Sequence, residues 1–222
     1  MIAAAYATIV QILDVVSDPP SAFRRIAEGR CRWLLLALAA GALAAVLQYI
    51  EYNAVFAQGA ASLTPEQTAS LHGRFVALQL VGSLVAPLVV LARIVLAAYL
   101  IWVGTMIAGI DITFGRMLAV AASAQIVVVL HGAVNTAIEA LAHLPLRHGF
   151  ELGLNLLVPA GVLSHFLALV NPFTIWYLAL FILALRVLTG ARWRNAAYAL
   201  GPYAAVYLLF FTFQQSVIGG RV

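Results

Sequence analysis

Long apolar runs alternate with short polar segments along the whole chain. The apolar runs cover residues 33–50, 75–108, 117–139, 172–188 and 195–217. A helix needs about 20 mostly apolar residues to cross the hydrocarbon core of a bilayer. The pattern therefore predicts an all-α fold, a polytopic membrane bundle of five transmembrane helices.

The amino-terminal segment has a different pattern. Apolar side chains recur there at helical steps of four and three, at Ile2, Tyr6, Ile9, Leu13 and Val16. This spacing predicts a short amphipathic helix that lies in the membrane surface. The run Ser17-Asp18-Pro19-Pro20 should end it. A second helix then places Phe23 and Ile26 on one face, and Gly29 should end that helix.

These patterns divide the chain into two regions. Residues 1–32 form cytoplasmic, interfacial helices, and residues 33–222 form the membrane domain. Basic helices next to a membrane often act as topology signals and headgroup anchors, which is the interpretation that we favour. A docking surface for a cytosolic partner is the alternative.

Further signals concern the first two spans. Ala37, Gly41 and Ala45 give the first span a small-residue face suited to close helix packing. The segment Thr64-Pro65-Glu66-Gln67 is a capping box, so a helix should begin outside the membrane and run into the second span. At 1.5 Å per residue, residues 75–108 would extend about 50 Å, so this span must tilt, kink at Pro87 or protrude.

The arginines indicate how the chain is oriented. Residues 152–170 are apolar enough to cross, but polar residues and a proline interrupt them. If they do not cross, eight arginines lie on the amino-terminal side and three on the other; if they cross, the split is six to five. The positive-inside rule favours the first arrangement. We therefore predict five spans, a cytoplasmic amino terminus, an external carboxyl terminus, and a re-entrant or surface segment before the fourth span.

A tight turn at Gly190 joins the last two spans. Arg186, Arg192 and Arg194 bracket it, which places this turn on the cytoplasmic side by the same rule. The orientation of the whole chain follows from this placement.

Composition agrees with a membrane location. The chain is 64% hydrophobic and 9% charged, whereas soluble domains are about a quarter charged. The net charge of +4 comes from arginine alone, and the arginines lie at helix ends instead of forming a solvated face for nucleic acid. Cys31 is the only cysteine, which excludes an internal disulfide and a CxxC site. We read no removable signal peptide in the first residues.

Arg93 lies inside the second span, where an unpaired arginine costs about 2.5–3.5 kcal/mol. The second and third spans should form an antiparallel hairpin that places Arg93 level with Gly132. His131, Asn135 and Glu139 lie near that level, spaced by four on one helix face. We expect the side chains of this intramembrane polar cluster to form polar contacts with Arg93 and so to have a structural role in holding the helices together. A polar pathway or small cavity for a substrate or proton is the alternative.

Catalytic and metal-binding patterns are weak in this sequence. His143, His148 and Glu151 match no recognised spacing of metal ligands, so a solvated loop is favoured. No HExxH, GxSxG or glycine-rich phosphate loop occurs. A lone His131 with scattered serines is little support for an intramembrane protease. We expect no catalytic residues, no metal and no cofactor.

The order of these features resembles the Yip family, membrane proteins named for interaction with Ypt/Rab GTPases, and in particular its bacterial branch. The most specific likenesses are Pro20-x-x-Phe23-x-x-Ile26, the run Phe173-Thr174-Ile175-Trp176, and the turn from Gly190 to Tyr198. The resemblance implies a five-helix bundle with a cytosolic amino terminus. It brings no catalytic residues.

The same resemblance bears on partners. Eukaryotic members of the Yip family take part in vesicle traffic and bind small GTPases. The alanine- and arginine-rich, lysine-free composition is typical of a bacterial gene, so a GTPase partner is not expected.

We therefore expect a non-enzymatic protein of a bacterial inner membrane with a membrane-organising or scaffold role. Its partners would be the lipid bilayer and, through small-residue faces, further copies or other membrane proteins, without nucleic acid. A small transporter or channel that uses the Arg93 cluster is the alternative. An intramembrane enzyme has the weakest support.

Overall fold

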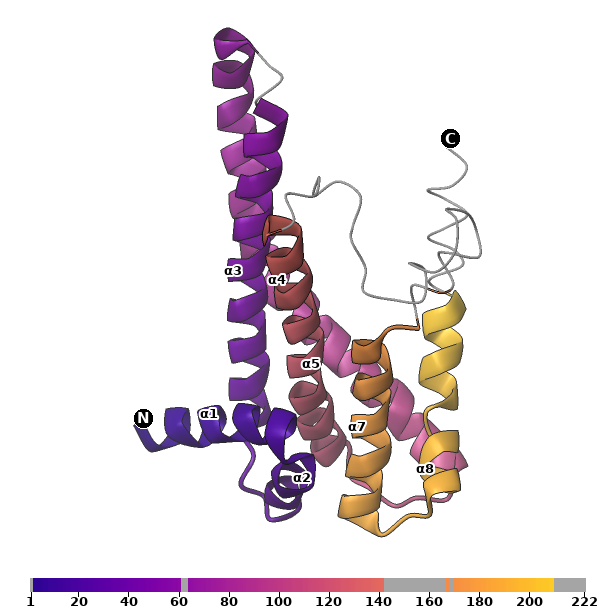
Figure 1. Cartoon of the computed structure of the whole chain (residues 1–222). Helices are drawn as coiled ribbons and strands as arrows, with labels where there is room; N and C mark the ends of the chain where they lie inside the picture. Colours follow the sequence, from indigo (N-terminus) through magenta and orange to yellow (C-terminus); the bar gives the residue numbers. More distant parts are fainter. Residues whose placement is uncertain (1, 61–63, 142–166, 168–169, 210–222) are drawn as a thin grey trace. The chain divides into compact units, whose positions relative to one another are not determined.

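The chain folds into helices, and a computed structural model describes residues 2–60, 64–141, 167 and 170–209 (Figure 1). No strand occurs in these described residues. The helices are α1 Ile2–Ser17, α2 Pro19–Ala27, α3 Trp33–Ala60, α4 Pro65–Ile107, α5 Phe114–Leu141, α7 Pro172–Thr189 and α8 Trp193–Tyr198. Residues 201–209 are helical as well. The predicted all-α class is confirmed.

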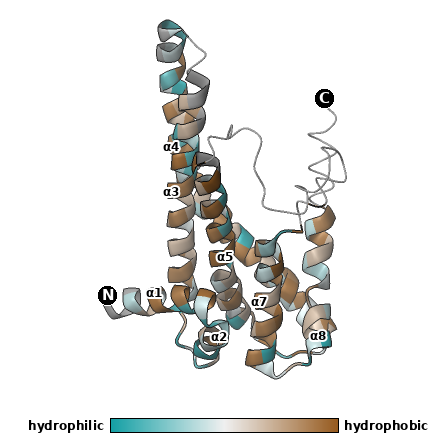
Figure 2. Ribbon diagram, in the orientation of Figure 1, coloured by the Kyte–Doolittle hydropathy of each residue, from teal (hydrophilic) through white to brown (hydrophobic). Residues whose placement is uncertain are grey.

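Four helices within the described residues are long and apolar enough to cross a membrane. Their candidate spans are Trp33–Ala54, Glu66–Ile107, Phe114–Ile138 and Pro172–Thr189. Figure 2 shows hydrophobic residues along their lengths. The first four predicted spans, over residues 33–50, 75–108, 117–139 and 172–188, each fall on one of these helices. A multi-pass helical membrane protein is therefore confirmed.

The fifth predicted span and the segment before the fourth are only partly described. Residues 195–217 begin in α8, and a turn at Ala199 and Leu200 interrupts the helix just before Pro202. Residues 210–217 lie outside the described residues, and so does nearly all of 152–170. The total of five spans and the re-entrant segment stay predictions.

The chain forms two compact units. Unit 1 contains residues 1–33, 93–124 and 178–222, and unit 2 contains residues 34–92 and 125–177. Both α4 and α5 contribute to each unit because the chain passes from one to the other within these helices.

Within unit 2, small residues let α3 and the first half of α4 approach closely. A Cβ atom added at Gly41 would lie 3.0 Å from the Cα of Pro87, and one added at Gly82 would lie 3.0 Å from the Tyr52 ring. Ala37, on the same α3 face as Gly41, is buried. The predicted small-residue face of the first span is confirmed as a packing face, and its neighbour is Pro87 of the same chain.

The connection between α3 and α4 is shorter than we predicted. We expected a polar segment after residue 50, but α3 continues to Ala60. The Phe56 ring packs against Phe75 of α4 at a centroid distance of 4.5 Å, and this contact stabilises the extra turns. The predicted capping box is present: the Gln67 amide donates to Thr64 Oγ1 at 3.3 Å, and the Thr64 amide donates to Gln67 Oε1 at 3.1 Å.

Unit 1 has a buried core built from several helices. Its fully buried large side chains include Phe23 of α2, Ile101 of α4, Met117 of α5 and Phe181 of α7. Gly109 has a φ of +67°, which allows the sharp turn between α4 and α5. Across that turn the Trp102 indole donates to the Ile112 carbonyl at 3.0 Å.

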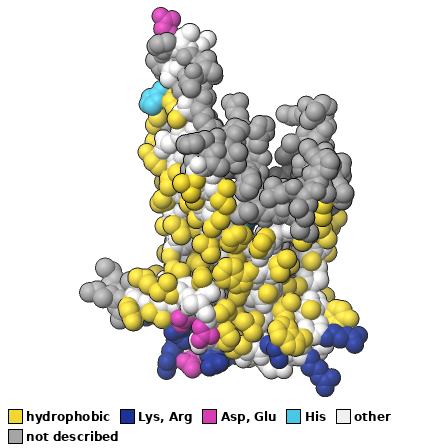
Figure 3. All heavy atoms as spheres, viewed as in Figure 1, with side chains coloured by type: hydrophobic (Ala, Val, Ile, Leu, Met, Phe, Trp, Pro, Cys, Tyr) yellow, Lys and Arg dark blue, Asp and Glu magenta, His cyan; other side chains and the backbone are white. Residues whose placement is uncertain are grey.

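Several arginines of unit 1 lie together at one end of it. Figure 3 shows them beneath α2 and at the turn between α7 and α8. The exposed guanidinium of Arg116, beside the α4–α5 turn, donates to the Ala27 carbonyl at 3.3 Å and so ties that turn to the end of α2. The end of α2 and the α4–α5 turn therefore lie together, and the arginine count assigned both to the same side of the membrane.

Candidate functional site

Residues 2–32 fold into what we call the amino-terminal cap. Helix α1 ends at Ser17, whose hydroxyl donates to the Leu13 carbonyl at 2.9 Å. The Ser21 hydroxyl donates to Asp18 Oδ2 at 2.5 Å at the start of α2. Gly29, with a φ of +71°, follows the end of α2. Both predicted helix ends are confirmed.

The apolar stripe of α1 faces away from the rest of unit 1. Tyr6 is 70% exposed, Ile9 56%, Leu13 60% and Val16 42%. The opposite side of the helix is buried, with Val15 fully covered. A stripe of large apolar side chains left uncovered on a membrane protein is suited to contact with lipid.

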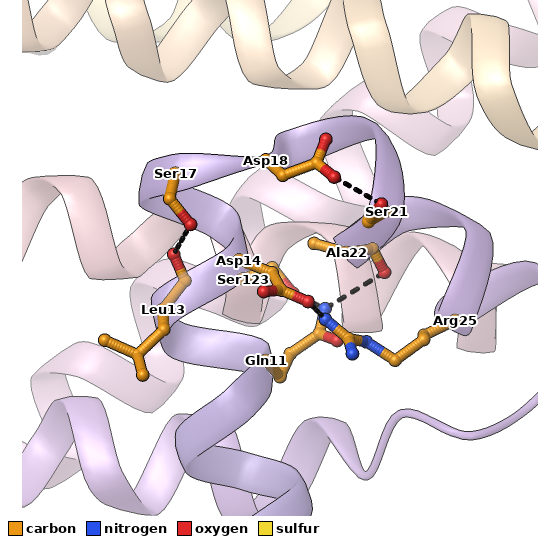
Figure 4. Close-up of polar contacts among 9 residues, drawn as sticks. All are labelled: Gln11, Leu13, Asp14, Ser17, Asp18, Ser21, Ala22, Arg25 and Ser123. Carbon is orange, nitrogen blue, oxygen red and sulfur yellow. Dashed lines mark hydrogen bonds and ion pairs between the residues drawn. The ribbon is translucent and has the colours of Figure 1, made fainter.

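Polar contacts fix this orientation of α1 (Figure 4). Gln11 is buried, and its Nε2 donates to the Ala22 carbonyl at 3.2 Å and to Ser123 Oγ of α5 at 3.3 Å. Asp14 forms an ion pair with Arg25 of α2. The sequence placed Gln11 off the apolar stripe but did not predict that it would bind α5.

The thiol of Cys31 lies at the junction of the cap with α3. Burial raises the pKa of Cys31 from 9.0 to about 11, and a hydrogen bond with Ser123 and the charge of Arg25 lower the pKa by smaller amounts. The thiol therefore stays protonated at neutral pH, which makes it a poor nucleophile.

The family-like motif residues hold the helices in place. Pro20 lies in the first turn of α2, and the side chains of Phe23 and Ile26 are buried. Phe23 and Ile26 thus pack α2 against the rest of unit 1. Gly190, with a φ of +70°, reverses the chain after α7.

The motif at the start of α7 has a similar role. The Thr174 amide donates to Asn171 Oδ1 at 2.7 Å, so Asn171 caps the start of α7. The ring of Phe173 stacks on His131 with centroids 4.8 Å apart, and Trp176 is half-buried. A role in catalysis is not indicated by any of these contacts.

The intramembrane polar cluster is described only in part. Asn135 Nδ2 lies 3.1 Å from His131 Nε2, as the spacing of four predicts. Arg93 is exposed and belongs to unit 1, whereas His131 and Asn135 belong to unit 2. The side chain of Glu139 lies outside those described. That Arg93 is satisfied by this cluster therefore stays a prediction.

The structure adds a polar contact that the sequence did not predict. The Thr136 hydroxyl of α5 donates to Glu51 Oε1 of α3 at 2.8 Å. In the sequence, Glu51 directly follows the apolar run over residues 33–50. That position is the signal from which a contact with a neighbouring membrane helix could have been predicted. Asn135 Oδ1 nearby in the sequence is buried without a hydrogen-bond partner among the described residues.

His143, His148 and Glu151, the residues weighed as metal ligands, lie outside the described residues. Among the residues that are described, no cluster of three histidine, cysteine or acidic side chains could hold a metal ion. His72 instead packs its ring against Phe56.

The apolar helices, the basic helix ends and the amphipathic cap define a multi-pass α-helical membrane protein. The model of the Yip1 domain family matches residues 13–213. The chain therefore belongs to the Yip1 domain family. No curated protein and no solved structure matches the chain.

Proposed function

We propose that the protein is a non-enzymatic scaffold that organises the membrane around it. The supporting observation is the orientation of α1. Its apolar stripe is uncovered, while Gln11 and Asp14 bind its other side to the protein. A helix held in this way inserts its apolar face into the headgroup region and displaces lipid there.

The proposed location is the inner membrane of a bacterium. The amino-terminal cap and the turn at Gly190 lie in the cytoplasm, and the carboxyl terminus lies in the periplasm. The positive-inside rule supports this orientation, because arginines next to α2 and at the turn between α7 and α8 lie at one end of unit 1. A GTPase partner and nucleic acid form no part of the proposal.

A scaffold requires contacts with further copies or other membrane proteins. Gly41 cannot supply such a contact, because Pro87 already occupies its surroundings. Exposed apolar side chains of α3 and α4, such as Leu38 at 57% and Leu84 at 74%, remain open to a neighbour within the described structure.

Photo-crosslinking in native membranes tests the scaffold role. A photoreactive residue at Leu38 or Leu84 should give discrete products, each with a second copy or one membrane protein. The matched control is a photoreactive residue at Ala37, which is buried and should give no intermolecular product. Products with lipid alone from every exposed position would contradict the proposal.

A small transporter or channel is the second candidate. The His131–Asn135 contact and the Thr136–Glu51 hydrogen bond place polar groups inside apolar helices, and Asn135 Oδ1 has no described partner. Polar groups within membrane helices often mark solute or proton pathways.

Substitution within the cluster separates the two candidates. The variants Arg93→Gln, His131→Leu and Asn135→Leu would be reconstituted in liposomes and assayed for proton and solute flux. Lost flux with an unchanged melting temperature supports transport. Absence of flux in the wild type, with a lower melting temperature in the variants, supports a structural role for the cluster.

A further inference from the structure

The guanidinium group of Arg186, at the end of α7, lies over an aromatic ring. Its guanidinium carbon lies 4.1 Å from the centroid of the Trp193 ring, which follows the turn at Gly190. A stacked guanidinium keeps its N–H groups in its own plane, free to meet a planar or tetrahedral anion. Arg186 Nε is buried and has no hydrogen-bond partner among the described residues.

The neighbouring residues repeat this arrangement. Arg194 lies over the Tyr198 ring at 5.5 Å, and its Nε donates to the Tyr198 hydroxyl at 3.2 Å. Arg192 is exposed. Trp193 is 56% exposed and Tyr198 62%. We name the group Arg186, Arg192, Trp193, Arg194 and Tyr198 the arginine turn.

The arginine turn has three positive charges, and none of them forms an ion pair with a described residue. The sequence contains no aspartate or glutamate after Glu151. Elsewhere in unit 1 two arginines have carboxylate partners: Arg25 pairs with Asp14, and Arg30 pairs with Glu28 at 3.3 Å. Within the described part of the chain, no carboxylate lies within ion-pair distance of the arginine turn. Its counter-anion must then come from outside those residues.

The position of the arginine turn identifies that anion. Helix α7 is a candidate span over Pro172–Thr189, so Arg186 in its last turn lies where the span leaves the membrane. Exposed tryptophan and tyrosine are typical of this depth, at the level of the lipid phosphates. We propose that the arginine turn is a binding site for the phosphate of an anionic phospholipid. This inference rests on the proposed membrane-organising function and names its lipid class.

The recognition would use two kinds of contact. Arg186, fixed by Trp193, presents paired N–H donors to one phosphate, a geometry that lysine cannot reproduce. Arg192 and Arg194 add charge that favours an anionic lipid over a zwitterionic one.

Native mass spectrometry of the full chain in detergent micelles tests the inference. Titration with phosphatidylglycerol and with phosphatidylcholine gives the affinity for each lipid. The wild type should prefer phosphatidylglycerol. Loss of one charge-assisted contact should weaken binding of that lipid by about tenfold in Arg186→Gln, and Arg186→Lys should also lose affinity. The double variant R192Q/R194Q should lose most of the preference.

Arg74→Gln is the matched control, because Arg74 is also an exposed arginine on a membrane helix and forms no ion pair with described residues. It should keep the preference of the wild type. Melting temperatures in phosphatidylcholine alone report whether each variant folds. Since Arg192 and Arg194 are exposed, R192Q/R194Q should fold even if Arg186→Gln does not.

Equal affinity of the wild type for both lipids would overturn the inference. So would an equal loss in Arg74→Gln and the arginine-turn variants. If the variants keep their lipid preference but lose a protein crosslink in membranes, the turn docks a protein and the inference is wrong. If only the scaffold proposal is wrong, the protein will form no protein crosslinks but will still prefer phosphatidylglycerol.

Discussion

Because Gly104 has no side chain, two backbone segments of unit 1 can lie in close contact. A Cβ atom at this position of α4 would overlap the carbonyl group of Ala199, which lies in the turn after α8. We expect Gly104→Ala to lower the free energy of unfolding by about 1–3 kcal/mol. The added methyl group would force apart α4 and the turn after α8, and that movement would disturb the packing of the adjoining helices. Thermal unfolding in detergent measures the change.

Gly115→Ala is the control for this substitution. Gly115 lies in the first turn of α5, and a Cβ atom there would meet nothing within 4 Å. Alanine also favours the helix, so this variant should be neutral or slightly stabilised. Equal melting temperatures for the two variants would show that the close approach of Gly104 and Ala199 does not form.

Cys31 gives a second prediction at the scale of the residue. Its pKa, raised by burial from 9.0 to about 11, lowers the thiolate fraction at pH 8 by about a hundredfold. Alkylation by iodoacetamide should therefore be slow in the folded protein and fast after denaturation in SDS. Because Cys31 is the only cysteine, a single mass increment reports the reaction. Equal rates in the folded and denatured protein would contradict this account.

The same pKa shift has a consequence for stability. The folded state holds the Cys31 proton more tightly than the unfolded state does. The protonated Cys31 thiol therefore stabilises the folded state fully below pH 9. This stabilisation is lost as the pH rises from 9 to about 11. Cys31→Ser should remove this part of the alkaline loss of stability, which melting curves between pH 8 and pH 11 measure.

At the scale of the element, α1 should lie in the membrane surface with one face in lipid. In a Cys31→Ser background, a nitroxide label at Leu13→Cys should be accessible to oxygen in the bilayer and protected from a polar nickel reagent. A label at Ala7→Cys, exposed but off the apolar stripe, should show the opposite preference. Equal accessibility at both positions would show that α1 lies in water.

Local signals predicted most helix ends. The prolines after Ser17, the glycines at 29 and 190, and the capping box at Thr64 each act through a few neighbouring residues, and all four appear where expected. Such signals are readable because backbone geometry and capping are decided within one turn.

Contacts between distant residues were not predictable in the same way. The extension of α3 to Ala60 depends on the ring of Phe75 in another helix. Gln11 binds Ser123, 112 residues away, and Thr136 binds Glu51, 85 residues away. Helical spacing assigns a residue to a face but not to a partner. It therefore predicted the His131–Asn135 contact within α5 and missed these two.

At the scale of the whole molecule, the account depends on orientation. Several arginines of unit 1 lie at one end of it, and Arg116 joins the α4–α5 turn to the end of α2. The arginine turn at the end of α7 lies at the same end. The positive-inside rule then predicts that all three are cytoplasmic.

The most direct test labels single cysteines from outside intact cells with a membrane-impermeant maleimide, in the Cys31→Ser background. Ala7→Cys reports the amino-terminal cap, Ala191→Cys the turn after Gly190, and Val222→Cys the carboxyl end. The account predicts that only Val222→Cys reacts in intact cells and that the other two react after the inner membrane is opened. Labelling of both chain ends in the same compartment would contradict it.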